Sequence, residues 1–150
     1  SCLPVKCLEN LFPVSKRKEK KILEVCAAPG GKTAQLIDCG FQSVSLDISE
    51  YRINQLKTNL DRLGYKPEII CTDFLNYDCD QEFDAILLDA PCSASGLIQK
   101  KPEILITNKQ TDLRKLKVEQ GRLLEHSKKF IKKGGYIIYC VCSINNCEGL

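Results

Sequence analysis

The sequence predicts a single α/β domain in which helices cover both faces of a mostly parallel sheet. Short apolar runs typical of strands alternate with amphipathic segments typical of helices, and this alternation produces parallel strands joined by right-handed crossovers. The apolar runs also end in loops that carry glycine, an acid or cysteine. The chain has 150 residues, 43% of them hydrophobic and 27% charged, which suits one domain of ordinary size.

The first predicted strand, residues 22–25, leads into the most informative loop of the chain. The loop consists of Cys26, Ala27, Ala28, Pro29, Gly30, Gly31, Lys32 and Thr33. A helix is predicted over residues 32–38. In open α/β sheets, the loop after the first strand binds a nucleotide-like ligand. Glycines let the backbone approach such a ligand, and the helix N-terminus offers N–H groups to a carboxylate or phosphate.

Three ligand classes compete for this loop. Gly31-Lys32-Thr33 resembles the end of a phosphate-binding P-loop, but that motif needs a glycine where Cys26 stands. The dinucleotide fingerprint Gly-x-Gly-x-x-Gly is also absent, because Gly30 and Gly31 are adjacent and the fingerprint separates its glycines. A ligand with an adenosine and a compact charged tail remains, such as S-adenosylmethionine. The alternative to any ligand is a purely structural turn.

The rest of the chain predicts four further strands and two further helices. The strands are predicted over residues 43–46, 68–71, 83–88 and 136–141, and the helices over residues 49–63 and 110–132. The run 83–88 is almost wholly apolar, which predicts a strand buried on both faces. Gly64 is predicted to end the first of these helices, and Gly134-Gly135 the second.

Five loops are predicted to meet at one edge of the sheet, because each follows a strand. They are residues 27–33, Asp47, Asp73, residues 89–93 and residues 142–143. The carboxyl ends of parallel strands share an edge, and ligands bind there. Any one of these residues alone could be a cap or a turn residue, but together they predict a ligand site.

Two acids and an arginine predict an adenosyl ligand at this edge. Asp47 ends the second strand, a position from which a carboxylate accepts both ribose hydroxyls. Asp73 ends the third strand, where it or its loop reaches the adenine amino group. Arg52, one turn into the next helix, is expected to pair with Asp47 or contact the ribose; the alternative is a plain surface arginine.

Two cysteines at strand ends predict the chemistry. A buried cysteine is usually a small hydrophobe, but Cys92 and Cys142 enter ligand-facing loops, where exposure and helix N-termini are expected to lower a thiol pKa. A thiol beside a methyl donor suits methylation of cytosine C5. Addition of the thiolate at C6 makes C5 nucleophilic, and expulsion of the thiol restores aromaticity. Asp89 is placed to bond the N3 and N4 edge of the cytosine and to favour protonation of the base as the thiolate adds.

The motifs Ala-Ala-Pro-Gly-Gly-Lys-Thr, Asp-Ala-Pro-Cys-Ser and a late Cys-Ser resemble those of RNA cytosine-C5 methyltransferases of the Sun/RsmB and NOP type, over residues 22–148. The resemblance implies a Rossmann-like S-adenosylmethionine-dependent methyltransferase fold and formation of 5-methylcytosine through a covalent cysteine–C6 adduct. It makes Cys142 the nucleophile and Cys92 a residue that assists release of the RNA. The implied cofactor-binding residues are Ala27, Ala28, Pro29, Gly30, Gly31, Lys32, Asp47, Arg52, Asp73 and Asp89.

Within that family the chain resembles the bacterial members that act on small-subunit rRNA, so rRNA is expected as the substrate, with tRNA as the alternative. The family usually has Thr where this chain has Val141, and its members carry an upstream RNA-binding domain and two further strands. The chain lacks Met, so we expect a piece of a longer protein: a partial lead-in at 1–21, then a catalytic domain at 22–150 that is truncated after its fifth strand. That strand is expected to be an exposed edge.

Other features limit the partners. RNA binding is expected to rest on basic runs at 16–21, 114–117 and 128–133. Ten cysteines without a Cys-x-x-Cys pair favour a reduced, cytoplasmic setting, and with a single histidine, His126, which is expected to be solvated, no metal site is expected. We also expect a monomer. No segment is apolar and long enough to predict a membrane span. Two alternatives remain: a non-catalytic remnant that keeps only the cofactor-binding core, and another methyltransferase with this fold, against which residues 89–93 argue.

Overall fold

The computed structural model describes residues 2–97, 112–144 and 148, and within them forms one five-stranded sheet of order β3-β2-β1-β4-β5. The strands are β1 (Lys21–Val25), β2 (Gln42–Asp47), β3 (Glu68–Cys71), β4 (Phe83–Asp89) and β5 (Ile131–Cys140). The helices are α1 (Leu3–Leu11), α2 (Gly31–Asp38), α3 (Glu50–Arg62) and α5 (Leu113–Ser127), with short 3₁₀ turns η1 (Val14–Glu19), η2 (Phe74–Asn76) and η3 (Ser95–Leu97). Every pair of neighbouring strands is parallel, so the predicted fold class is confirmed.

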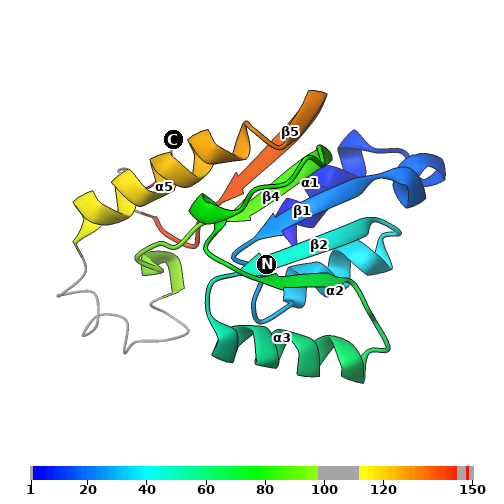
Figure 1. The fold of residues 1–150 in the computed structure, drawn as a ribbon, viewed down its shortest axis with the longest axis horizontal. Coiled ribbons are helices and arrows are strands. Elements are labelled where there is room, and N and C mark those ends of the chain that lie inside the picture. Colours follow the sequence, from blue (N-terminus) through cyan, green and yellow to red (C-terminus); the bar gives the residue numbers. More distant parts are fainter. Residues whose placement is uncertain (1, 98–111, 145–147, 149–150) are drawn as a thin grey trace.

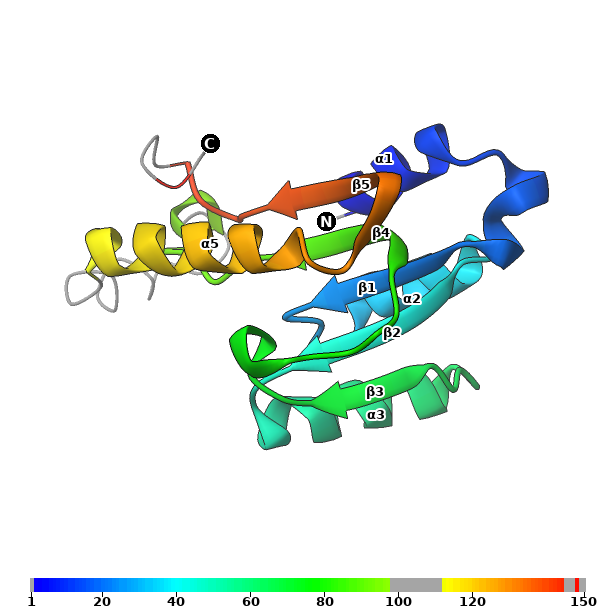
Figure 2. The ribbon, with the colours of Figure 1, turned by 45° about the horizontal axis from the view of Figure 1, so that its top comes forward.

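Helices cover both faces of this sheet: α1, α2 and α3 lie on one face and α5 on the other (Figures 1 and 2). Successive residues of a strand point to opposite faces. In β1, Ile22 therefore packs with Leu8 of α1, whereas Leu23 packs in the cluster that includes Leu123 of α5. Residues 83–88 of β4 are all buried, as their apolar sequence predicts. The core thus occupies both sides of the central strands.

The predicted end of the long basic helix at Gly134-Gly135 is wrong. The helix α5 ends at Ser127, and both glycines lie inside β5. The register between β4 and β5 shifts between Phe83 and Ala85, which marks a β-bulge. Gly134 adopts φ +80°, and a Cβ on Gly135 would lie 2.8 Å from the Asp84 carbonyl oxygen. These glycines therefore allow a bulge in the strand. The sequence alone does not distinguish such glycines from glycines that end a helix.

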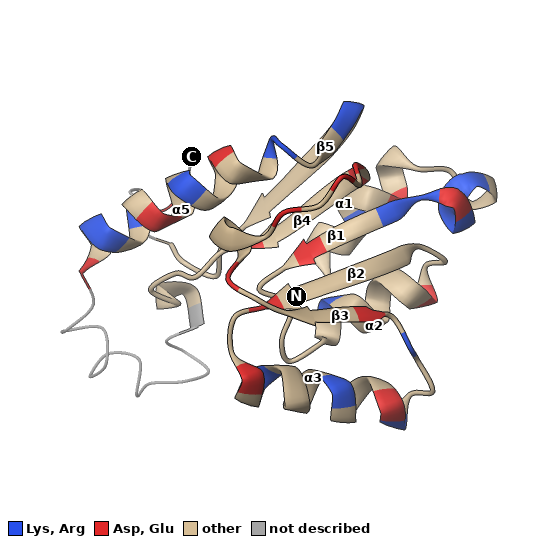
Figure 3. Ribbon diagram, viewed as in Figure 1, with Lys and Arg blue, Asp and Glu red and all other residues tan. Residues whose placement is uncertain are grey.

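The amino edge of the sheet gathers basic side chains around one buried acid. Lys20 and Lys132 pair with the Asp84 carboxylate at 2.8 and 2.9 Å. Burial alone would raise the pKa of Asp84, but the hydrogen bonds and charges of these lysines lower it to about 2. Basic residues are drawn over η1 and the start of β5 in Figure 3, far from the carboxyl edge. Two members of the basic runs at 16–21 and 128–133 are thus engaged in holding the fold.

Helix α1 was not among the predicted elements. It packs through Val5 and Leu8, and the adjoining Phe12 contacts the rings of Phe41 and Tyr136 edge-on at 6.0 and 5.8 Å. Because Tyr136 belongs to β5, α1 partly covers the edge strand, which pairs with β4 alone in the described sheet. Among the described residues, no helix has the length and apolar character needed to cross a membrane.

The bulge can be tested by Gly135→Ala. The added methyl group would press on the Asp84 carbonyl and on Ile131, so we expect a loss of about 1–3 kcal/mol in the free energy of unfolding, measured by denaturant titration followed by circular dichroism. Gly121→Ala is the control, because this α5 glycine has no atom within 4 Å of its Cβ position and the change should stabilise the helix by up to about 1 kcal/mol. Equal effects of the two changes would contradict the bulge packing.

Candidate functional site

The loops that follow the strands meet at the carboxyl edge of the sheet, as predicted. Lys32 at the start of α2 pairs with Asp89 at the end of β4. The backbone N–H of Ala28 donates to Asp47 at the end of β2, at 3.1 Å. The pairings are direct, so the side chains of three separate strand–loop units form one site.

The glycine-rich loop leaves open space beside its backbone. Gly30 adopts φ +98°, and a Cβ there would lie 3.3 Å from the Leu56 side chain. Gly31 begins α2, and a Cβ on it would meet no atom within 4 Å. Packing within the protein thus accounts for Gly30, whereas Gly31 leaves room at a helix N-terminus. A carboxylate-bearing ligand fits there, because the first N–H groups of a helix lack intrahelical partners.

Asp47 is hydrogen-bonded to the backbone of the glycine-rich loop. Its side chain is 1% exposed, and it accepts hydrogen bonds from the N–H groups of Ala28 and Ser49, both at 3.1 Å. Arg52 lies 3.4 Å from the same carboxylate and also donates to the Ala28 carbonyl. The expected pairing of Asp47 with Arg52 is therefore confirmed. A carboxylate accepts roughly four hydrogen bonds, so Asp47 keeps acceptor capacity beyond the two N–H groups that it holds.

Asp73 borders a cavity beside the ends of β1 and β2. Its carboxylate accepts from the N–H of Leu75 at 3.0 Å and caps η2. The cavity has a volume of about 60 Å³ and is lined by Val25, Cys26, Leu46, Asp47, Ile48, Thr72, Asp73, Phe74, Pro91, Glu119 and Leu123. A wider hollow of about 570 Å³ shares Ile48 and Asp73 with it. Apolar walls with carboxylates at the rim suit a flat heterocycle.

A buried acid beneath the loop escaped the sequence analysis. Glu24 of β1 is 1% exposed and accepts hydrogen bonds from Thr33 at 2.6 Å and Ser45 at 3.3 Å. Burial raises the pKa of Glu24 to about 7, although these hydrogen bonds and the charge of Lys32 oppose the rise. An acid inside an otherwise apolar strand was the available signal. Through Thr33, Glu24 ties the start of α2 to the sheet.

Asp89 is engaged by Lys32. The Lys32 ammonium donates to one carboxylate oxygen, and the Cys140 sulfur lies 3.4 Å from the other. Burial acts to lower the pKa of Lys32, but the hydrogen bond and charge of Asp89 outweigh it, so the pKa is raised. The Asp89 side chain is still 34% exposed. The pair joins the glycine-rich loop to the cysteine loop, a link that sequence spacing did not reveal.

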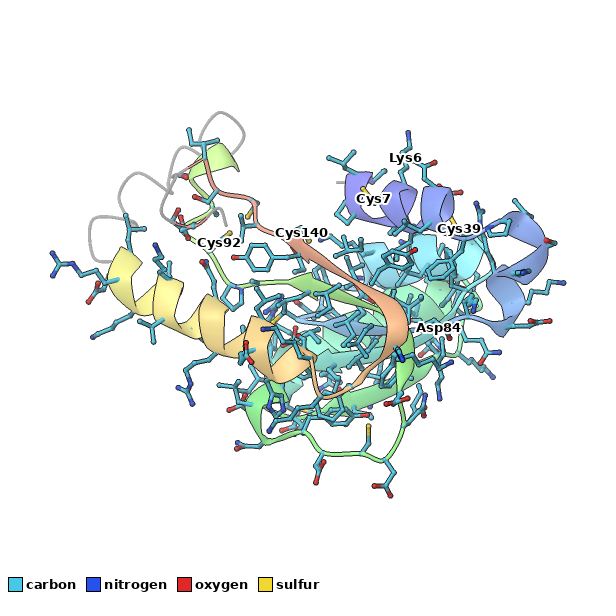
Figure 4. All side chains as sticks on the ribbon, turned by 90° about the horizontal axis from the view of Figure 1, so that it is seen from above. Lys6, Cys7, Cys39, Asp84, Cys92 and Cys140 are labelled. Carbon is cyan, nitrogen blue, oxygen red and sulfur yellow. The ribbon has the colours of Figure 1, made fainter. Side chains whose placement is uncertain are left out.

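The two predicted cysteines form a thiol pair. The sulfurs of Cys92 and Cys142 lie 3.1 Å apart, and the Cys142 N–H donates to the Cys92 sulfur at 3.2 Å. Both thiols are free, and Cys142 is the more exposed. Figure 4 shows Cys92 and Cys140 at one end of the sheet and Asp84 at the other. The expected meeting of these two loops is confirmed.

The expectation of a lowered thiol pKa is wrong for Cys142. Burial raises the pKa of Cys142 to about 12, and the hydrogen bond and charge of Cys92 and the charge of Asp89 act in the same direction. Only the Cys142 backbone N–H opposes the rise. The groups that act on this thiol are an acid and a second thiol rather than cations, which explains the failed expectation.

His126 is not solvated as expected. Its ring lies edge-on to Phe74 and Phe130, with centroids 5.0 and 5.2 Å away, and its Nε2 atom is 3.2 Å from the Tyr77 carbonyl oxygen. The helical position hid this packing because Phe74 and Tyr77, which are remote in sequence, supply two of the three partners. Within the described part of the chain, no three His, Cys, Asp or Glu residues gather as metal ligands would.

The similarity to known proteins extends along nearly the whole chain. The family described as "16S rRNA methyltransferase RsmB/F" matches residues 12–149, so the chain belongs to this family. The ribosomal RNA small subunit methyltransferase B of Shewanella oneidensis is 41% identical over 128 residues, which cover 82% of this chain. That of Photorhabdus laumondii is 38% identical over 150 residues, covering 95% of this chain.

A solved structure shares the same arrangement. NSun6 from Pyrococcus horikoshii, solved with SFG, matches with a TM-score of 0.71 at 27% identity, over 90% of this chain and 37% of that one. The chain spans 30% of the length of the Shewanella relative and 34% of the Photorhabdus relative. The family of the chain is therefore established, over about a third of the length of these relatives.

The raised pKa of Cys142 predicts sluggish alkylation. At pH 8 the rate of its reaction with iodoacetamide should be roughly a hundredfold below that of an ordinary exposed thiol and should rise with pH without a plateau below pH 10. Exposed Cys2 provides the internal reference, and peptide mass spectrometry separates the sites.

The variant Cys92→Ala removes one cause of the shift, so the Cys142 alkylation profile should move to lower pH. Burial, the larger cause, remains, and the shift should be partial. A plateau near pH 9 in the unaltered protein, or an unmoved profile in Cys92→Ala, would count against this account.

Proposed function

We propose that this chain is the catalytic core of an S-adenosylmethionine-dependent enzyme that forms 5-methylcytosine in RNA, with rRNA as the substrate. Membership of the RsmB/F family supports the proposal. The observation that carries it is the thiol pair: Cys92 and Cys142, 3.1 Å apart, lie beside Asp89, which Lys32 joins to the glycine-rich loop. A donor loop and two thiols at one edge suit methyl transfer to a carbon made nucleophilic by thiol addition.

S-adenosylmethionine supplies the methyl group when bound. The open space beside Gly31 and the helix N-terminus suits the carboxylate of its amino-acid tail. Asp47, with acceptor capacity left, suits the ribose hydroxyls, and the cavity bordered by Asp73 suits adenine. The proposed binding residues are Ala27, Ala28, Pro29, Gly30, Gly31, Lys32, Asp47, Arg52, Asp73 and Asp89.

In the proposed reaction, the Cys142 sulfur forms a bond to cytosine C6. A thiol whose pKa is about 12 does not attack as a free thiolate near pH 7, so loss of its proton has to accompany bond formation. The Asp89 carboxylate, one third exposed beside the thiols, accepts this proton from Cys142 and passes it to N3 in the same step. After C5 takes the methyl group, Cys92 in its thiolate form accepts the C5 proton, and Cys142 leaves as a thiolate while the C5–C6 double bond re-forms. The N3 proton then returns through Asp89 to the Cys142 sulfur.

The RNA is proposed to approach along α5. Arg114, Lys115 and Arg122 line the hollow of about 570 Å³ that adjoins the adenine cavity. Phosphate groups are the natural partners of such cations. The runs at 16–21 and 128–133 include lysines engaged by Asp84 at the opposite edge, so the α5 run is the better placed of the three. Action as a monomer in the cytoplasm is part of this proposal.

Cofactor binding is tested by titrating S-adenosylhomocysteine into the protein in a calorimeter. Asp47→Asn should weaken binding about tenfold or more, because it loses both the charge that holds Ala28 and Arg52 and the acceptor for the ribose. Asp61→Asn, an exposed acid on α3, should bind as the unaltered protein does. Equal affinities for Asp47→Asn and Asp61→Asn would contradict the Asp47 assignment. If a folded sample of the unaltered protein gave no binding heat, the proposal that it binds S-adenosylmethionine would be wrong.

The thiol roles are tested by denaturing electrophoresis of the protein, as its gene encodes it, with substrate RNA. Cys142→Ala should give no covalent protein–RNA adduct, because the attacking sulfur is gone. Cys92→Ala should attack and methylate but release slowly, so adduct should accumulate. Both variants should bind RNA alike, since the base leaves its stack before either thiol acts. The opposite pattern would reverse the roles, and cofactor binding without adduct in the unaltered protein would favour the non-catalytic remnant.

A further inference from the structure

A buried carboxylate lies between the loops of the two cysteines. Glu148 is 2% exposed. One of its oxygens accepts from the Ser93 N–H at 2.8 Å, and the other accepts from the hydroxyl groups of Ser93 and Ser143. Ser93 directly follows Cys92, and Ser143 directly follows Cys142. A single side chain is therefore bonded to the neighbours of both thiols.

Glu148 is itself anchored to the fold. Gln120 of α5 donates to its carboxylate at 3.3 Å and to the Pro91 carbonyl at 2.8 Å. The Tyr139 hydroxyl of β5 donates to the Glu148 backbone carbonyl at 3.2 Å. Burial of a carboxylate is costly unless hydrogen bonds compensate it. Here the bonds come from α5, β5 and both cysteine loops, so the position of the carboxylate is determined from several sides.

The sheet by itself does not hold the thiols together. Pairing of β4 with β5 ends at Asp89 and Cys140, and the last cross-strand bond runs from the Ala90 N–H to the Cys140 carbonyl. Both thiols lie beyond that point. Past the end of the sheet, the bonds of Glu148 act together with direct contacts between the two loops, in which the Ser143 hydroxyl lies 3.1 Å from that of Ser93 and 2.9 Å from that of Ser95.

The two loops depend on Glu148 unequally. The Cys92 loop receives two bonds through Ser93, from its N–H and its hydroxyl. The Cys142 loop receives one through Ser143. It is also bonded to the residues that follow Ser93, because the Gly96 N–H donates to the Cys142 carbonyl at 3.0 Å and the Ser95 and Ser143 hydroxyls lie 2.9 Å apart. Loss of the carboxylate should therefore displace Cys92 more than Cys142.

We propose that Glu148 is a positioning residue that keeps Cys92 beside Cys142, so that the thiol that assists release stays next to the thiol that attacks. The structural half of this proposal, thiol alignment, stands on the geometry. The catalytic half, release of the RNA, rests on the proposed function.

Thiol alignment is measured with dibromobimane, which becomes fluorescent when it bridges two nearby thiols. The unaltered protein should form a Cys92–Cys142 bridge, identified by peptide mass spectrometry. Glu148→Gln keeps the size of the side chain but loses its charge and one acceptor oxygen, and bridging should slow about tenfold. Glu125→Gln, an exposed acid of α5 that is paired with Lys128, is the control and should bridge at the unaltered rate.

Folding of each variant is checked by its thermal transition. Ser143→Ala provides a second change, which removes the bond of the Cys142 loop to the carboxylate and the contacts of Ser143 with Ser93 and Ser95. Both bonds from Ser93 to Glu148 remain, so bridging should slow to a smaller extent. Unchanged bridging in folded Glu148→Gln would overturn the proposal, as would absence of the bridge in the unaltered protein.

The catalytic consequence has its own readout. With substrate RNA, Glu148→Gln should accumulate covalent adduct and turn over about tenfold more slowly, with little change in KM, because attack by Cys142 persists while release is impaired. A merely structural role would lower adduct and turnover together, and that result would refute the positioning role. If the unaltered protein forms no adduct, the proposed function fails, while the bridging experiment still decides the role of Glu148 in alignment.

Discussion

The parallel register of β1 with its two neighbours is the constraint on which the site depends. Val25 lies opposite Leu46 of β2 and Leu88 of β4, so all three strands end at the same level. The loops that follow must then emerge side by side. Asp47 can therefore accept a hydrogen bond from the Ala28 N–H, and Asp89 can pair with Lys32. A slip of one residue would turn every side chain of the strand to the other face and separate these pairs.

Buried carboxylates supply the second level of order. Glu24 bonds Thr33, Asp47 bonds Ala28, and Glu148 bonds Ser93, so each acid fixes a loop at the carboxyl edge. Asp84 does the same for two lysines at the amino edge. Such groups add little net stability, because desolvation offsets most of their attraction. Their value here is geometric: loops without regular structure acquire one arrangement.

The same burial that orders the site also sets its chemistry. The Cys142 thiol lies near Cys92 and Asp89, which oppose its ionisation, while the Lys32 cation is committed to Asp89. In the proposed reaction, such a thiol stays protonated until the reacting base is in place. The proposal therefore makes the order of proton transfers the part of the reaction that the protein controls.

The order of strands and helices, the glycine-rich loop and the meeting of Cys92 with Cys142 could be predicted from the sequence, because periodicity and strand-end position are local properties and parallel strands share an edge. The start of β5, the packing of His126 and the role of Glu148 could not, because each depends on partners that are distant in the chain. The pKa of Cys142 belongs to the same group, since burial and neighbouring charges exist only after folding. The sequence by itself determined which strand-end loops meet at the site. The tertiary structure decided which further residues join them, which atoms bond and in which protonation state, because those depend on distances that no local pattern encodes.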